Sequence, residues 1–61
     1  MSGYIVRFER VDYKPAEEYY YRDKEDAANH LQLFLDDDSG LYRRIVIIDL
    51  DSNKEIATIA F

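Results

Sequence analysis

Residues with high strand propensity gather in four short segments, and one segment repeats its apolar residues at helical spacing. The four segments predict strands over residues 3–11, 18–22, 41–50 and 55–61. The helical spacing predicts an α-helix over residues 24–37, with Asp23 as its N-cap and Gly40 as its C-terminal cap. The apolar stripe that should face the sheet consists of Ala27, Ala28, Leu31, Phe34 and Leu35. The predicted order of elements is ββαββ.

The helix returns the chain across one face of the sheet, so the third strand should run parallel to the second. If the third strand pairs with the first, all neighbours are antiparallel and the strand order is 2-1-3-4. This order puts the two longest and most apolar strands in the middle. Residues 45–48 are apolar on both faces, as is typical of a central strand. The sequence therefore predicts an α+β two-layer sandwich: a single domain over residues 1–61, a four-stranded antiparallel sheet, and one helix on one face.

The open face of this sheet is the first candidate interaction surface. Side chains alternate between faces along a strand, so Tyr20 should lie on the open face if Tyr19 and Tyr21 pack under the helix. We expect Ile45 and Ile47 beside it, together with Ile5. A patch of tyrosine and isoleucine rimmed by charges has the composition of a protein interface. Stacking of single-stranded nucleic acid would require basic surroundings, which this chain does not supply.

The last strand is the second candidate, because it should form an edge. It has no proline, and no charge follows Glu55. Such an edge invites pairing with another strand. Thr58 and Ala60 are the outward positions expected at this interface. The alternative is a short, frayed chain end.

Three consecutive aspartates, Asp36, Asp37 and Asp38, form the third candidate. Acids at the end of a helix oppose its dipole, so they are either a solvated end neutralised by Arg43 and Arg44 or an acidic contact for a basic partner. His30 flanks the apolar stripe without a nucleophile in any known motif, and we expect no catalytic role for it. Residues 49–53 share the opening of a calcium loop but lack its glycine and its glutamate, so a hairpin turn is expected.

Composition narrows the class of function. The chain has 61 residues, no cysteine, and 13 acids against 8 bases, giving a net charge of −5. The negative charge argues against direct binding of nucleic acid and allows a basic protein partner. There is no basic leader segment and no apolar run long enough to span a membrane, so we expect a cytoplasmic protein.

These observations predict a small, non-enzymatic protein-interaction module without metal or cofactor. It should form a homo-oligomer through the edge strand or the open sheet face. The alternative is an acidic inhibitor of phage or mobile-element type, which imitates nucleic acid and occupies the basic cleft of a nuclease or another nucleic-acid-binding protein. Its carboxylates would come from Glu17, Glu18, Asp36, Asp37, Asp38, Asp49 and Asp51.

Overall fold

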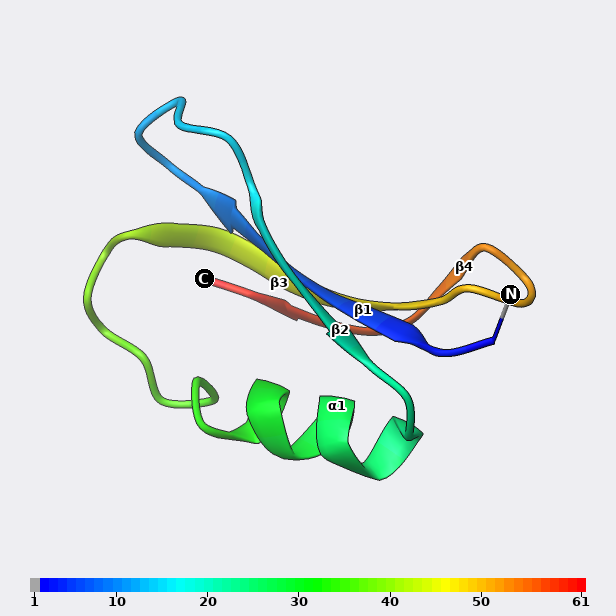
Figure 1. The fold of residues 1–61 in the computed structure, drawn as a ribbon. Coiled ribbons are helices and arrows are strands. Elements are labelled where there is room, and N and C mark those ends of the chain that lie inside the picture. Colours follow the sequence, from blue (N-terminus) through cyan, green and yellow to red (C-terminus); the bar gives the residue numbers. More distant parts are fainter. Residues whose placement is uncertain (1) are drawn as a thin grey trace.

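The computed structural model describes residues 2–61 and shows one helix packed on one face of a four-stranded antiparallel sheet (Figure 1). The elements are β1 (Tyr4–Arg10), β2 (Glu17–Tyr21), α1 (Lys24–Gln32), β3 (Tyr42–Asp49) and β4 (Lys54–Ala60). The strand order is β2-β1-β3-β4, so the predicted fold class and topology are confirmed. β1 and β3 form the centre of the sheet, and β2 and β4 form its two edges.

The hydrophobic core lies between α1 and the sheet face that α1 covers. Its buried residues are Val6, Phe8, Ala27, Ile45 and Ile47. Val6 pairs with Ile47 and Phe8 pairs with Ile45, so the two central strands present these side chains in two neighbouring rows. Burial of each such side chain contributes about 1.5–3 kcal/mol relative to its exposure, which makes these rows the main source of stability.

The helix α1 is shorter than predicted, because it ends at Gln32 rather than at residue 37. Beyond it the chain forms tighter turns, in which the Phe34 amide donates to the Leu31 carbonyl at 3.0 Å and the Asp37 amide to the Phe34 carbonyl at 3.1 Å. Aspartate is a poor helix former, and its charge opposes the dipole at a helix C-terminus. The run at residues 36–38 therefore favours an early end of the helix.

The two predicted caps differ in outcome. Asp23 occupies the N-cap position with extended backbone, as predicted, but its side chain makes no capping hydrogen bond. Gly40 has a φ of 73° and lies in the loop before β3, well beyond the end of α1. Gly40 is thus a turn residue, and the prediction that it caps the helix is wrong.

Candidate functional site

Ile45 and Ile47 lie on the helix side of the sheet, so their predicted placement on the open face is wrong. They are 0% and 2% exposed. Side chains opposite each other in an antiparallel pair share a face, and the partners of these two residues are the core residues Phe8 and Val6. The reason for the error is that β3 is apolar on both faces, so its sequence pattern does not define which residues point inward.

The open face instead carries Val46 and Ile48 from β3. Ile5 pairs with Ile48 on one side and with Tyr20 on the other, so Tyr20 belongs to this face as predicted. Val46 is 0% and Ile48 8% exposed, although α1 covers the opposite face. Something other than a helix must therefore shield Val46 from water.

The side chains next to Val46 on the open face are those of Arg7 and Thr58, its partners in the sheet, and of Arg44, which forms an ion-pair bridge. The Arg44 guanidinium contacts Glu9 of β1 at 2.5 Å and Glu55 of β4 at 3.5 Å. Arg44 belongs to β3, which lies between β1 and β4. Its guanidinium therefore lies above β3 on the open face, where it reaches the carboxylates on both neighbouring strands. Glu55 lies opposite Ile48 in the pairing with β3, so the bridge extends from the Arg44 row across Val46. The methylene groups of long charged side chains cover apolar surface in this way.

A β-bulge concentrates positive charge at Glu9. The pairing of β1 with β3 shifts between Glu9 and Arg10, which leaves Arg43 as an extra residue on β3. As a result Arg43 donates to Glu9 Oε1 at 2.9 Å, in addition to the contact with Arg44. The hydrogen bond from Arg44 is the main cause that lowers the pKa of Glu9, with a smaller contribution from Arg43 and partial opposition from burial. Pairing of Arg43 and Arg44 with the aspartate run, one of the two alternatives for that run, is absent among residues 2–61.

Tyr20 is engaged with the N-terminal segment rather than displayed freely. Its side chain is 56% exposed, and its hydroxyl donates to the Ser2 carbonyl at 3.1 Å. Gly3 is buried beneath it with a φ of 128°, and a Cβ there would lie 2.6 Å from a Tyr20 ring carbon. The ring therefore closes over Gly3, and only its outer side is available to a partner.

The β4 strand leaves one edge of the sheet unpaired within the described chain. The Phe61 amide donates to the Arg43 carbonyl at 3.1 Å, and Ile59 pairs with Ile45. Backbone groups alternate in direction along an antiparallel strand, so Thr58 and Ala60 turn theirs away from β3. Both residues are exposed, as predicted for outward positions.

The helix does not cover β4. α1 contacts β1, β2 and β3 but not β4, and Figure 1 shows it on one face of the sheet. Ala57 and Ile59 are consequently only half-buried, while Ile56 is 41% and Phe61 49% exposed. Beyond Lys54 and Glu55, the outer edge of β4 thus combines unpaired backbone with uncharged, mostly apolar side chains at residues 56–61.

The three aspartates lie in the loop between α1 and β3. Asp36 and Asp38 are exposed, and Asp37 is half-buried and accepts a hydrogen bond from the Ser39 hydroxyl at 2.7 Å. Asp49 and Asp51 lie at the opposite end of β3, where Asp49 pairs with Lys54 next to the hairpin turn. Glu17 and Glu18 form ion pairs with Arg10 and Arg7. The carboxylates therefore stand at separate ends of the molecule and do not form one ridge.

His30 belongs to an aromatic cluster between α1 and the sheet. Its ring centroid lies 5.0 Å from those of Phe8 and Tyr19, and its Nδ1 forms a 2.7 Å hydrogen bond with the Tyr21 hydroxyl. Burial lowers the pKa of His30, because the apolar rings disfavour the charged form. His30 is a structural contact that joins the helix to β2.

The loop between β1 and β2 forms a surface that no pattern in the sequence indicated. A pocket of about 430 Å³ is lined by Arg10, Val11, Tyr13, Lys14 and Arg43. Tyr13 is fully exposed, at 102%, and has a φ of 62°. The left-handed conformation costs a non-glycine residue about 1–2 kcal/mol. Glycine and asparagine are the residues that usually adopt this conformation. A tyrosine at position 13 therefore gives no signal in the sequence that the backbone turns in this way.

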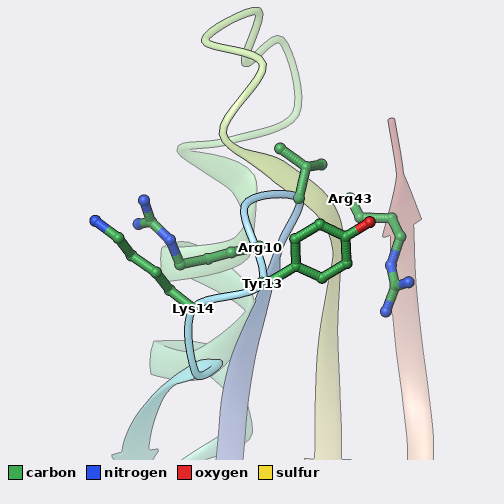
Figure 2. Close-up of a pocket in the computed structure, with 5 residues that line it drawn as sticks. Arg10, Tyr13, Lys14 and Arg43 are labelled. Atoms are coloured by element: carbon green, nitrogen blue, oxygen red, sulfur yellow. The ribbon is translucent and has the colours of Figure 1, made fainter.

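Arg10 fixes the base of this loop. Its guanidinium contacts Asp12 at 2.7 Å and Glu17 at 2.8 Å. The hydrogen bonds from Arg10 lower the pKa of Asp12 to about 2, and those carboxylates in turn raise the pKa of Arg10. Figure 2 shows the Arg10 and Lys14 side chains extending in the same direction from the loop, while the Tyr13 ring points toward the side where Arg43 lies.

Within residues 2–61, no three histidine or acidic side chains are placed to hold a metal ion. Residues 50–53 form the expected hairpin turn, with Asn53 at a φ of 57° and the Asp51 amide bonded to the Asp49 carboxylate at 2.9 Å. The described part of the chain contains no helix with the length and apolarity needed to cross a membrane. Compared with known protein families, curated proteins and solved structures, the chain matches none of them.

Proposed function

We propose that the chain is a non-enzymatic, cytoplasmic protein-interaction module that forms a homodimer by antiparallel pairing of β4 with β4 of a second copy. The observation that carries this proposal is the outer edge of β4, where the backbone of Thr58 and Ala60 is unpaired and residues 56–61 carry no side-chain charge. Unpaired edges of this kind bind further strands. Natural sheet edges are commonly protected by a lysine, a proline or a covering element. β4 has Lys54 only at its hairpin end, residues 56–61 contain neither lysine nor proline, and α1 does not cover the strand.

The distribution of charge favours this edge as the place where two copies of the chain meet. A molecule with a net charge of −5 repels its copies at most of its surface. Residues 56–61 are the part of the sheet edge where two copies meet without juxtaposing carboxylates. A twofold axis is also the simplest way to satisfy two identical edges at once.

The side-chain pattern of β4 is complementary to itself. If the twofold axis passes beside Thr58, Thr58 pairs with its own counterpart and Ile59 pairs with Ala57. β4 is regular over residues 57–60, and its register shifts at Ile56, where the regular part of the pairing ends. Ile59 then faces an alanine, and this half-buried side chain loses contact with water in this arrangement.

Sedimentation velocity over a range of protein concentrations tests the proposal. The wild type should shift from monomer to dimer, and Thr58→Lys and Ala60→Pro should stay monomeric. Proline at position 60 removes an amide that points away from β3, so β3–β4 pairing should survive. Ser52→Lys, in the hairpin turn, adds the same charge away from the edge and should still dimerise. A wild type that remains monomeric at the highest concentration contradicts the homodimer.

We do not propose that the chain is an acidic inhibitor that imitates nucleic acid. Its carboxylates lie at both ends of β3, and Glu17 and Glu18 already pair with arginines. An inhibitor of that kind needs carboxylates in a row at the spacing of phosphates. It stays a prediction from charge alone.

A further inference from the structure

The pocket at the β1–β2 loop has three properties that are typical of a binding site and that are not needed for folding. It has a volume of about 430 Å³, within the range of pockets that hold ligands. It presents an aromatic side chain that contributes nothing to the core, since Tyr13 is 102% exposed. It also holds that side chain in a left-handed backbone conformation, with a φ of 62°. Strained residues persist where the surrounding structure determines them, and they cluster at functional positions.

The loop conformation is determined by its neighbours. Arg10 binds Asp12 and Glu17, the Asp12 carboxylate accepts the Lys14 amide at 3.3 Å, and the Val11 amide donates to the Leu41 carbonyl at 3.0 Å. These bonds anchor both ends of the loop, so Tyr13 is presented at a fixed place. A pre-organised loop loses less entropy on binding than a mobile one.

Two cations remain available at the pocket. Lys14 forms no ion pair within the described residues, and the Arg43 side chain is 70% exposed beyond its single bond to Glu9. Arg10 is not available to a ligand, because its side chain is only 15% exposed and its guanidinium is paired with Asp12 and Glu17. The pocket thus offers an aromatic surface with one unpaired cation from the loop, Lys14, and one exposed cation from β3, Arg43, which also contacts Glu9.

We propose that this pocket binds an acidic peptide segment, with an apolar or aromatic side chain against Tyr13 and Val11 and with carboxylates on Lys14 and Arg43. Carboxylates farther than about 8 Å from the pocket are largely screened at physiological ionic strength. The nearer ones, Glu9, Asp12 and Glu17, are already paired with arginines. Nucleic acid is the poorer fit, because its regularly spaced phosphates would need more cations than Lys14 and Arg43 supply. The site is independent of dimerisation through β4.

Amide chemical shifts of ¹⁵N-labelled protein test the proposal. The probe is the blocked tripeptide acetyl-Glu-Phe-Glu-amide, and the comparison probes are acetyl-Lys-Phe-Lys-amide, acetyl-Glu-Gly-Glu-amide and a single-stranded oligothymidylate. The acidic aromatic peptide should shift the amides of residues 10–14 and 43 in a saturable manner and bind more weakly as salt rises. The basic peptide should leave these amides unchanged, and the peptide without the aromatic residue should bind at least about tenfold more weakly, as expected for loss of an aromatic anchor.

Variants separate binding from folding. Tyr13→Asn should have a melting temperature equal to or above that of the wild type, because asparagine tolerates the left-handed conformation, while binding weakens about tenfold or more. Lys14→Gln should weaken binding about threefold, as for an exposed charge contact, and the matched control Lys54→Gln at the far end of the sheet should not.

Four results would overturn the proposal. They are the absence of saturable shifts, equal binding of the acidic and basic peptides, tighter binding of the oligothymidylate, and a melting temperature of Tyr13→Asn well below that of the wild type. The last result would assign Tyr13 a role in folding instead. Tyr13→Asn and Lys14→Gln both retain the β4 edge. A protein that does not bind the peptide can therefore still form the dimer, and a monomeric protein can still bind the peptide.

Discussion

Gly3 and Tyr20 should be energetically coupled, because the Tyr20 ring occupies the space that a side chain at position 3 would need. A Cβ at position 3 would lie 2.6 Å from the ring, and the Gly3 φ of 128° is unfavourable for alanine. The backbone strain of Gly3→Ala costs about 1 kcal/mol. Displacing the ring also breaks the hydrogen bond from Tyr20 to the Ser2 carbonyl, which costs about 1 kcal/mol more. We therefore expect a loss of about 2 kcal/mol in total.

A double-mutant cycle measured by urea denaturation tests this coupling. In the Tyr20→Ala background the ring is already gone, so Gly3→Ala should cost only the strain of about 1 kcal/mol, leaving a coupling of about 1 kcal/mol. Gly40→Ala is the matched control, since its φ is 73° and no atom lies within 4 Å of the added Cβ. Its cost should be about 1 kcal/mol in both backgrounds. Additive costs of Gly3→Ala and Tyr20→Ala would refute the placement of the ring over Gly3.

Three further predictions address the core, the aromatic cluster and the acidic run. Ile47→Ala should cost about 2–5 kcal/mol in denaturant melts, whereas Leu33→Ala, at a position 80% exposed, should cost less than about 0.5 kcal/mol. Burial lowers the pKa of His30, so the unfolded chain binds the proton more readily; stability should therefore fall as the pH drops below about 6.5, and His30→Gln should remove that fall in melts at pH values above and below this point. Replacing all three aspartates at residues 36–38 by asparagine should raise the free energy of unfolding by about 0.3–1 kcal/mol in a thermal melt, and a decrease would mean that the bond between the Asp37 and Ser39 side chains has a structural role.

The sequence predicted the architecture because several independent patterns agreed. Tyr19, Tyr20 and Tyr21 alternate between faces as expected, and they pair with Val6, Ile5 and Tyr4 of β1. The acidic first turn after Asp23 correctly marks the start of α1. Turn residues separate β3 from β4 at the predicted place.

The faces of β3 could not be predicted by the same reasoning. An apolar strand flanked by two others allows either phase, and the choice depends on which side chains fit beneath α1. Phe8 pairs with Ile45 on the helix side, which leaves Val46 on the open face between Arg7 and Thr58. The bulge at Arg43, which brings a second arginine to Glu9, is likewise a feature that strand propensity does not predict.

The end of α1 and the β1–β2 pocket were also beyond sequence patterns. The apolar stripe continues past Gln32, but Phe34 reaches Phe8, at 4.8 Å between ring centroids, from a turn rather than from the helix. Tyr13 adopts a conformation that its residue type disfavours. Neither feature follows from local preference, since both arise from contacts between segments distant in the chain.

Pairing of β4 with a second copy is the central claim, and a cysteine cross-link tests it most directly. The chain has no cysteine, so each single-cysteine variant reports on one position only. In the proposed register Thr58 lies opposite its own counterpart, about 5.5 Å away between Cα atoms, a distance that a disulfide can bridge. Thr58→Cys should therefore form a covalent dimer rapidly under mild oxidation at low protein concentration, whereas Ser52→Cys in the hairpin turn should do so slowly. Equal rates for the two variants would contradict the account.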